Sequence, residues 1–349
     1  MENLISQPTP DGIAFPFSDL PPPGGAIEVA RGVFWLRMPL PFALDHINLW
    51  LIADGEGWCV VDTGLNFAPA RERWTAARQG ILQGRPIQRV IVTHYHPDHI
   101  GLACWLAGQP GQPGCRIWMN AREHQAAVQV FNEDPGVRLD FFRRHGLDDQ
   151  QLDALGDWGS AYRRNVSGLP ETPVELRDGQ LLRIGDHDWR VIIGRGHSPE
   201  HATLHCPDLG VLLAGDQILP KITPHVGVWH FDPEADPVRL FLASIENFRA
   251  LPAQTLVLPA HGIPFTGLSA RLDYLARHHA QRLHEVLEAC SGPHSAAELM
   301  PTLFRRQLDT QQIPFAMGET IAHLNHLHQQ GNLVRGIDAN GVFRFERRH

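Results

Sequence analysis

The chain has 349 residues, of which 43% are hydrophobic and 19% are charged, and its formal net charge is −8. This composition is typical of a globular protein rather than of a disordered chain. No apolar stretch approaches the roughly 18 residues of a membrane-spanning helix, and the first residues lack the pattern of a signal peptide. The five dispersed cysteines are odd in number, so we expect reduced thiols and a cytoplasmic protein.

The length of the chain predicts one large core and a smaller module. Residues 1–25, which end in a run of Pro and Gly, are expected to form an irregular lead-in segment. Apolar runs predict strands over 27–36, 47–52 and 58–61. A helix predicted over 69–82 leads into the next strand.

Four residues that can bind metal ions lie within six positions at the end of an apolar run. Residues 89–93 are largely β-branched and apolar and predict a short buried strand. If strand geometry continues, His94 and His96 face the same side and can chelate one ion together. Asp98 and His99 follow a proline that ends the strand, and they can reach a second position nearby. A chance cluster among 21 histidines explains this order poorly, so the segment indicates half of a binuclear site.

The region from 121 to 168 has a helical, strongly amphipathic pattern and is interpreted as an insertion between two of the motifs. Its aromatic residues are Phe131, Phe141, Phe142, Trp158 and Tyr162. Two interpretations are open for this insertion. It is either a lid that covers the metal site and shapes the substrate pocket, or a helical unit that only packs on the edge of the core.

Three further metal-binding side chains lie far along the chain. His197, Asp216 and His261 each follow a short apolar run and lie close to a glycine. The end of a strand can present such side chains while the backbone bends away. Each one alone would be interpreted as an ordinary turn residue, but together with the first cluster they predict a shared site.

The pattern changes after residue 264, where a smaller unit over 265–349 is predicted. One long helix is expected over 269–289, and Ser295 and Glu298 have the spacing of a capping box that opens another. A second amphipathic helix and a hairpin over 332–345 follow. Helices followed by a terminal hairpin are typical of a winged helix.

The order of these residues, together with Asp62 in a Val-Asp-Thr-Gly segment, resembles the five-motif signature of the metallo-β-lactamase superfamily. The resemblance covers about residues 26–264 and implies an αββα sandwich. With the winged-helix-like module added, the chain resembles a subfamily of β-lactamase-like hydrolases that includes a mitochondrial endoribonuclease.

The resemblance implies two metal ions that share one carboxylate. The ligands of the first ion would be His94, His96 and His197. The ligands of the second ion would be Asp98, His99 and His261. Asp216 would bridge the two ions, and Asp62 would orient the ligands from behind them.

The ligand set also separates the branches of the superfamily. The best-known zinc β-lactamases use a Cys ligand and lack the bridging Asp, whereas this chain has Asp216, so the pattern is closer to the glyoxalase II, lactonase and nuclease branches. Two divalent ions about 3.5–4 Å apart can share a water and lower its pKa, which gives a bridging hydroxide. By resemblance, Asp98 would orient this nucleophile or move its proton. Imidazole and carboxylate ligands favour zinc, with iron and manganese as alternatives.

Two reactions remain open: hydrolysis of a small ester, thioester or lactone, and, as the runner-up, cleavage of RNA or DNA phosphodiesters. Residues 265–349 hold 9 Lys/Arg against 8 Asp/Glu, and the helix over 318–330 that would enter a groove has no Lys or Arg. Binding to nucleic acid normally needs a basic surface, so a small-molecule substrate is favoured. The basic residues that favour the runner-up are Arg335, Arg344, Arg347 and Arg348.

Two basic residues near the motifs, Arg195 and Lys221, are candidates for binding an anionic group of the substrate, with plain surface charge as the alternative. His225 and His230 are expected to pack. No basic set equivalent to the glutathione-binding residues of glyoxalase II is found after residue 264, which argues against glutathione thioesters. A purely structural metal site is disfavoured because three ligands per ion plus one bridge leave room for water. A homodimer formed through the C-terminal module is compatible with catalysis.

Overall fold

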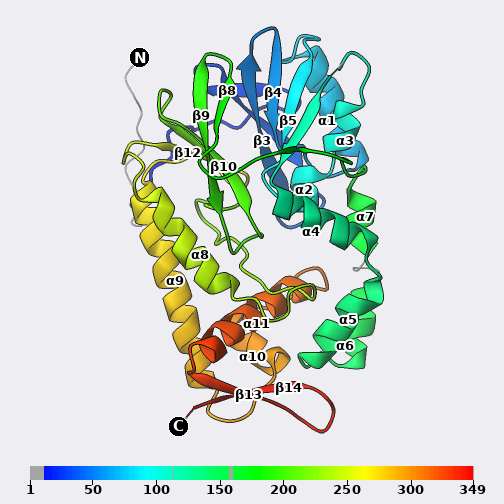
Figure 1. The fold of residues 1–349 in the computed structure, drawn as a ribbon, viewed down its shortest axis with the longest axis vertical. Coiled ribbons are helices and arrows are strands. Elements are labelled where there is room, and N and C mark those ends of the chain that lie inside the picture. Colours follow the sequence, from blue (N-terminus) through cyan, green and yellow to red (C-terminus); the bar gives the residue numbers. More distant parts are fainter. Residues whose placement is uncertain (1–11, 113, 157–159, 349) are drawn as a thin grey trace.

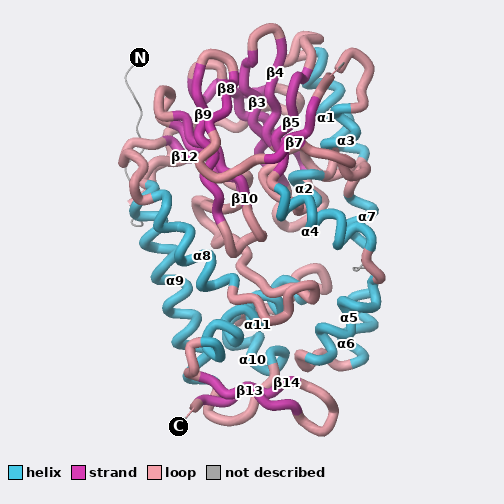
Figure 2. The backbone as a smooth tube through the Cα atoms, viewed as in Figure 1, coloured by secondary structure: helices cyan, strands magenta, loops and turns pink. Residues whose placement is uncertain are grey.

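In a computed structural model, residues 12–112, 114–156 and 160–348 are described and form two facing sheets with helices on both outer sides (Figures 1 and 2). The expected αββα sandwich is confirmed, and a C-terminal helical module lies below it in Figure 1. Residues 1–11 of the expected lead-in segment and Trp158 lie outside the described residues. No helix in the described part of the chain is long and apolar enough to cross a membrane.

The first sheet has seven strands that lie side by side in chain order. They are β1 (Ala26–Ala30), β2 (Val33–Pro39), β3 (His46–Asp54), β4 (Gly57–Val61), β5 (Ile87–Ile91), β6 (Arg116–Met119) and β7 (Val174–Glu175). Pairing is antiparallel from β1 to β4 and parallel from β4 to β7. The single strand predicted over 27–36 is wrong: Gly32, at φ 74°, turns the chain and makes two strands of it.

The second sheet has five strands in the order β12, β11, β10, β9, β8. They are β8 (Leu181–Ile184), β9 (His187–Gly194), β10 (His201–Cys206), β11 (Val211–Gly215) and β12 (Leu256–Pro259). The strands pair antiparallel except β11 and β12, which are parallel. The carboxyl ends of β11 and β12 therefore meet at one edge of the sheet.

Buried tryptophans fill the space between the two sheets. Trp35, Trp50 and Trp189 are at most 1% exposed. The Trp35 Nε1–H donates to Asn48 Oδ1 at 2.7 Å, and the Asn48 amide donates to the carbonyls of Pro259 and Gly262 at 2.9 Å each. Because unpaired buried polar groups are costly, this chain of bonds fixes the end of β12 against β3.

Helices cover both outer faces of the sandwich. Against the first sheet lie α1 (Ala68–Gln79), α2 (Pro97–Ile100), α3 (Ala103–Ala107), α4 (Ala121–Asn132) and α7 (Ala161–Asn165). Against the second sheet lie α8 (Pro237–Ile245), the 3-10 turn η2 (Glu246–Phe248) and the long α9 (Leu268–Ala289). In Figure 1, α9 runs from the sandwich down to the C-terminal module.

The helical insertion is divided between two parts of the molecule. Its helices α4 and α7 belong to the hydrophobic cluster of the first sheet, whereas α5 (Pro135–Arg144) and α6 (Asp149–Leu155) belong to the cluster of the C-terminal module. The backbone N–H of Ala297 donates to the His145 carbonyl at 3.1 Å. The Arg144 guanidinium lies 4.7 Å from the ring centroid of Phe343. The insertion therefore spans the side of the molecule from the sandwich to the module.

The C-terminal module consists of α10 (Ala296–Leu303), α11 (Ile313–Gln329) and the antiparallel hairpin of β13 (Leu333–Ile337) and β14 (Phe343–Arg347). The capping box expected from the sequence is present, with Ser295 and Glu298 each bonded to the other's backbone. The assignment of this module to the winged-helix class stays a prediction, as do the boundaries of the segments 1–25, 26–264 and 265–349.

The capping box gives a test of the module's stability. Ser295 is 2% exposed and its hydroxyl accepts the Glu298 N–H, so Ser295→Ala leaves a helix donor unpaired. We expect the free energy of unfolding to fall by about 1 kcal/mol. Urea denaturation measures the change, and Ser269→Ala at an exposed position of α9 is the control. An equal effect of both variants would contradict the capping role.

Candidate metal centre

The first cluster of ligand-type residues lies where the chain leaves the first sheet. The strand β5 ends at Ile91, two residues before the end of the strand predicted over 89–93, so His94 and His96 stand on a loop and not on a continuation of the strand. The strand ends because the Thr93 carbonyl accepts the N–H of Ala202 from the second sheet, at 2.8 Å, instead of a neighbour within its own sheet. This bond places the cluster between the two sheets.

A short helix carries the second half of the cluster. Pro97 occupies the first turn of α2, where its missing N–H costs nothing, and Asp98 and His99 follow on the same turn. The turn contributes Asp98 and His99 to one group of ligand-type atoms, and the loop before it contributes His94 and His96 to another, so one sequence motif serves two positions.

The other three candidates reach the same place from the second sheet. His197 follows β9, Asp216 follows β11 directly, and His261 follows β12. Gly215 has φ 50°, and a Cβ at this position would approach the His201 ring to 2.4 Å, so only glycine allows the turn that presents Asp216. All seven candidate ligand residues therefore meet at one edge of the sandwich.

The seven residues form two groups, and within each group the candidate ligand atoms lie within 4.8 Å of one another. The first group is His94, His96, His197 and Asp216. Its imidazole nitrogens converge, since His94 Nε2 lies 2.8 Å from His96 Nδ1 and 3.1 Å from His197 Nε2. Converging imidazole nitrogens beside a carboxylate fit a divalent cation.

The second group is Asp98, His99 and His261. Asp216 joins it to the first group: its carboxylate oxygens lie 3.5 Å from His99 Nε2, 3.4 Å from His261 Nε2 and 3.5 Å from His197 Nε2. Among the described residues, His99 Nε2 and Asp216 Oδ1 are buried without a hydrogen-bond partner. Buried polar atoms without partners at this point fit a bound cation. Asp216 therefore has the place that a bridging carboxylate would need.

Asp62 lies behind the second group, beside His99. Its carboxylate accepts the Thr93 N–H at 2.8 Å and lies 2.7 Å from His99 Nδ1. Asp62 has φ 61°, a left-handed backbone conformation that non-glycine residues adopt rarely. Because the Asp62 carboxylate lies next to Nδ1 of His99, the other ring nitrogen, Nε2, is directed at the site. Metal-binding histidines are commonly oriented by a carboxylate in this way.

Two backbone carbonyls orient further histidines in the same way, and the sequence gives no sign of them. His197 Nδ1 lies 2.9 Å from the His225 carbonyl, and His261 Nδ1 lies 2.8 Å from the His46 carbonyl. Both bonds direct Nε2 toward the ligand groups. A carbonyl acceptor has no side-chain signature, so only the fold reveals it.

Burial and charge set the protonation of the two groups differently. Burial lowers the pKa of His94, His96 and His197. Burial also acts on His261, but Asp216 and Asp98 outweigh it and raise the pKa to about 10. Burial opposes ionisation of Asp98, yet the neighbouring histidines hold its pKa below the usual range.

Two buried residues next to the ligands were not predicted. Glu123 of α4 is fully buried, and its carboxylate accepts bonds from both loops that carry the first group. His201 Nε2 accepts the Asp216 N–H at 3.0 Å and so fixes the backbone of the joining carboxylate. Neither has a local signal beyond its residue type, because both act on segments distant in the chain.

The two predicted anion-binding residues lie outside the ligand groups. The Arg195 guanidinium pairs with Glu200 at 2.9 Å, and the Lys221 ammonium lies 5.6 Å from the ring centroid of Phe15. Their role toward a substrate stays a prediction. His230 bonds to Glu133, consistent with its expected packing role.

A model of the metallo-beta-lactamase superfamily matches residues 43–261, and a model of the metallo-beta-lactamase-like C-terminal domain matches residues 283–348. The chain belongs to the metallo-β-lactamase superfamily. The matched superfamily segment contains all seven candidate ligand residues, from His94 to His261. The second match begins within α9 and includes α10, α11 and the hairpin.

Solved structures of superfamily members share both parts of the chain. A beta-lactamase domain protein from Burkholderia ambifaria is 44% identical, with 96% of this chain and 98% of that chain covered and a TM-score of 0.91. A metallo-beta-lactamase family protein from Thermus thermophilus is 30% identical, with coverage of 91% and 99% and a TM-score of 0.77.

Curated relatives are more distant. A probable metallo-hydrolase of Bacillus subtilis is 22% identical over 89% of this chain and 97% of its own length. The human acyl-coenzyme A thioesterase MBLAC2 is 24% identical, over 55% of this chain and 65% of its own length. A hydroxyacylglutathione hydrolase of Cereibacter sphaeroides is 29% identical, over 51% of this chain and half of its own length.

The position of Asp216 between the two groups gives a direct prediction. Asp216→Ala removes the carboxylate that both groups contact, so bound metal should fall well below two ions per chain and hydrolysis of any substrate should be abolished. Elemental analysis of the purified protein measures the metal content. Asp208→Ala, at an exposed carboxylate after β10, is the control. Unchanged activity of Asp216→Ala would contradict a two-ion site.

The raised pKa of His261 gives a second prediction, for protein from which metal has been removed. The folded-state pKa of about 10 lies above the ordinary value of 6.5, so this imidazole should stay protonated at pH 8. Its ion pairs should stabilise the fold fully below pH 6.5 and lose this effect as the pH rises through 10. An NMR titration of the imidazole nitrogens measures the midpoint. A midpoint at or below 6.5 would contradict the proximity of the two carboxylates.

Proposed function

We propose that this superfamily hydrolase binds two divalent metal ions at the two ligand groups and cleaves a small ester, thioester or lactone. The placement of Asp216 between the groups carries the proposal, because a shared carboxylate is what a pair of ions needs. Zinc is the favoured metal for this donor set, with iron and manganese as alternatives.

The residues of the site have separate tasks in this reaction. When bound, the ions supply Lewis acidity toward the substrate carbonyl and lower the pKa of water. Asp98 is proposed to hold the proton that the attacking water gives up. Its side chain is 20% exposed, against 10% for Asp216 and 3% for His261, so it can contact both water and the second group. Of the other ligands, His96 is half-buried and the rest are buried, which limits the access of bulk water to the site.

Two observations support an acyl substrate with an apolar part. The thioesterase and the hydroxyacylglutathione hydrolase among the relatives act on thioesters. In addition, an aromatic cluster stands on the segment that orients His197: the His225 and Trp229 rings contact Phe315 of α11, with centroids 5.3 and 5.8 Å apart. Phe315 remains 44% exposed, so α11 of the C-terminal module presents an apolar surface there.

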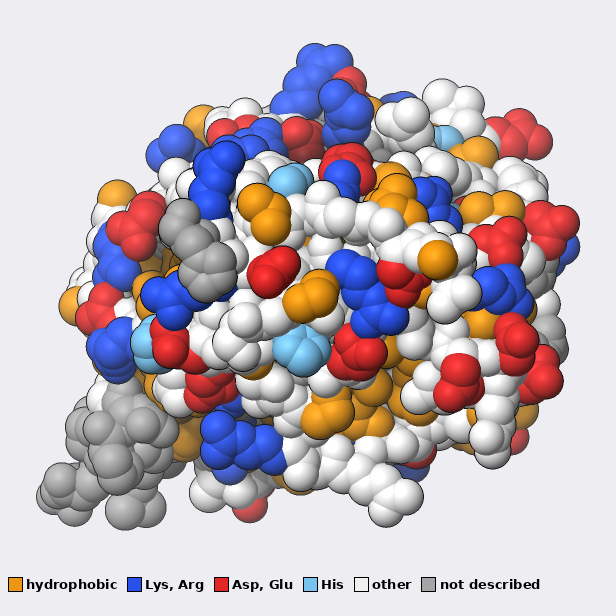
Figure 3. Space-filling view, turned by 90° about the horizontal axis from the view of Figure 1, so that it is seen from below, with side chains coloured by type: hydrophobic (Ala, Val, Ile, Leu, Met, Phe, Trp, Pro, Cys, Tyr) orange, Lys and Arg blue, Asp and Glu red, His pale blue; other side chains and the backbone are white. Residues whose placement is uncertain are grey.

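The runner-up reaction, cleavage of RNA, gains little support from the structure. Three of the four arginines on or after the hairpin pair with carboxylates: Arg335 with Glu234, Arg344 with Glu298 and Asp338, and Arg347 with Glu288. On the face shown in Figure 3, Lys and Arg side chains are interspersed with Asp and Glu. Binding to a phosphate backbone relies on unpaired positive charge, so nuclease activity is not favoured.

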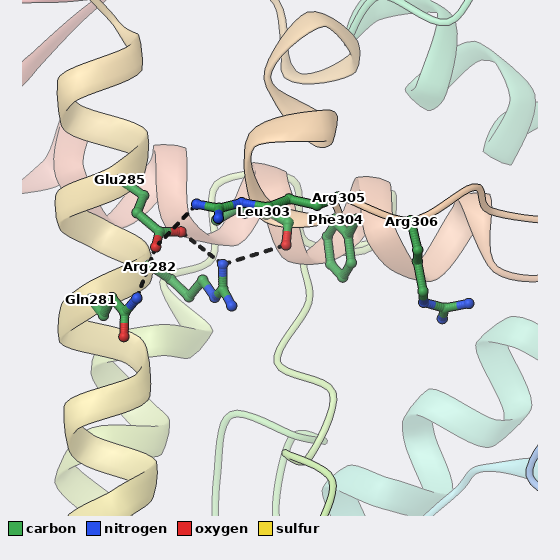
Figure 4. Close-up of a pocket in the computed structure, with 7 residues that line it drawn as sticks. All are labelled: Gln281, Arg282, Glu285, Leu303, Phe304, Arg305 and Arg306. Atoms are coloured by element: carbon green, nitrogen blue, oxygen red, sulfur yellow. Dashed lines mark hydrogen bonds and ion pairs between the residues drawn. The ribbon is translucent and has the colours of Figure 1, made fainter.

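Arginines also pair with a carboxylate in a cavity of about 380 Å³ between α9 and the end of α10. It is lined by Arg282, Arg305 and Arg306, but Glu285 binds Arg282 at 2.7 Å and lies 3.9 Å from Arg305 (Figure 4). Arg306 donates to Gln312. The cavity therefore offers little free charge to a nucleic acid.

A homodimer through the C-terminal module stays a prediction.

The substrate class can be tested with one comparison. The metal-loaded protein is assayed in parallel against acyl-coenzyme A and glutathione thioesters, lactones and single-stranded RNA, with Asp98→Asn as the matched inactive variant. We expect hydrolysis of at least one ester, thioester or lactone and a loss of at least about a hundredfold in Asp98→Asn. RNA cleavage that depends on Asp98 and outpaces every ester would overturn the proposal.

A further inference from the structure

Glu123 lies in the first turn of α4, which belongs to the insertion, and it is fully buried. Three donors converge on its carboxylate. Oε2 accepts the N–H of Tyr95 at 3.0 Å, and Oε1 accepts the Ser198 hydroxyl at 2.7 Å and the Glu200 N–H at 2.6 Å. A carboxylate accepts such bonds strongly, so it holds all three donors in place.

The donors belong to the two loops that carry the histidines of the first ligand group. Tyr95 lies between His94 and His96, and Ser198 follows His197. These loops come from different sheets and are about a hundred residues apart in the chain. The carboxylate of Glu123 thus sets the spacing of the three imidazoles that converge in the first group.

The second group has a different support. His99 is oriented by Asp62, and His261 by the His46 carbonyl. The Glu123 carboxylate instead accepts its bonds from Tyr95, Ser198 and Glu200, all on the loops of the first group. Its effect should therefore fall mainly on the first ion.

We propose that Glu123 is a positioning residue for the first metal ion, so that the insertion helps to set the geometry of the metal site. The proposal rests on the two-ion function. The alternative is that Glu123 only stabilises α4. The two differ in a measurable way, since a purely structural role lowers stability without distinguishing between the two ions.

The test measures zinc affinity by competition with a chromophoric chelator, for wild type, Glu123→Gln and Ser198→Ala. In Glu123→Gln the amide NH2 replaces one acceptor with donors, so at least one loop loses its bond at nearly constant volume. We expect about a tenfold to hundredfold loss of affinity at one of the two sites and little change at the other. Ser198→Ala removes one donor only and should shift the same site by a smaller factor.

The matched control is Asn120→Ala. Asn120 is 4% exposed and caps α4, accepting the Arg122 N–H and donating to the Leu176 carbonyl, but it bonds to neither ligand loop. It should lower the melting temperature and leave both affinities unchanged. If the Glu123 and Ser198 variants behave like this control, or lose affinity equally at both sites, the inference is wrong. Wild type that binds fewer than two ions would instead contradict the proposed function.

Discussion

The carboxylate of Asp216 is the interaction on which the site depends. It lies within 3.5 Å of imidazole nitrogens from both ligand groups, and those imidazoles belong to the segments that follow β5, β9 and β12. Without an anion between the groups, two cations bound there would repel each other, and so would the histidines when protonated. The turn at Gly215 and the bond from the Asp216 N–H to His201 hold this carboxylate in the gap.

Contacts elsewhere in the fold hold the ligand-bearing segments together. Tryptophans between the sheets and the amide of Asn48 fix the end of β12 against β3, which brings His261 to the motif of the first sheet. From the other side, α4 fastens the loops of the first group through Glu123. The insertion helices α5 and α6 share one hydrophobic cluster with the C-terminal module, and α11 reaches the segment that orients His197.

Much of the site could be predicted from the sequence because its ligands are side chains of distinctive type in a fixed order. The geometry around them could not. The strand before His94 ends earlier than its apolar pattern suggests, because Thr93 bonds across to the second sheet. The sequence does not show that the backbone carbonyls of His46 and His225 orient histidines. Nor does it distinguish Glu123 from an exposed glutamate on a helix, because its burial depends on the fold. The sequence shows the arginines of the terminal hairpin but not their partners, because some of the carboxylates that pair with them are remote in the chain, such as Glu234.

Anomalous X-ray diffraction at the absorption edge of the bound metal tests the central claim most directly. Crystals of the metal-loaded protein should show two peaks about 3.5–4 Å apart, one beside His94, His96 and His197 and one beside Asp98, His99 and His261, with Asp216 between them. A single peak at full occupancy, or peaks that do not contact Asp216, would contradict the account.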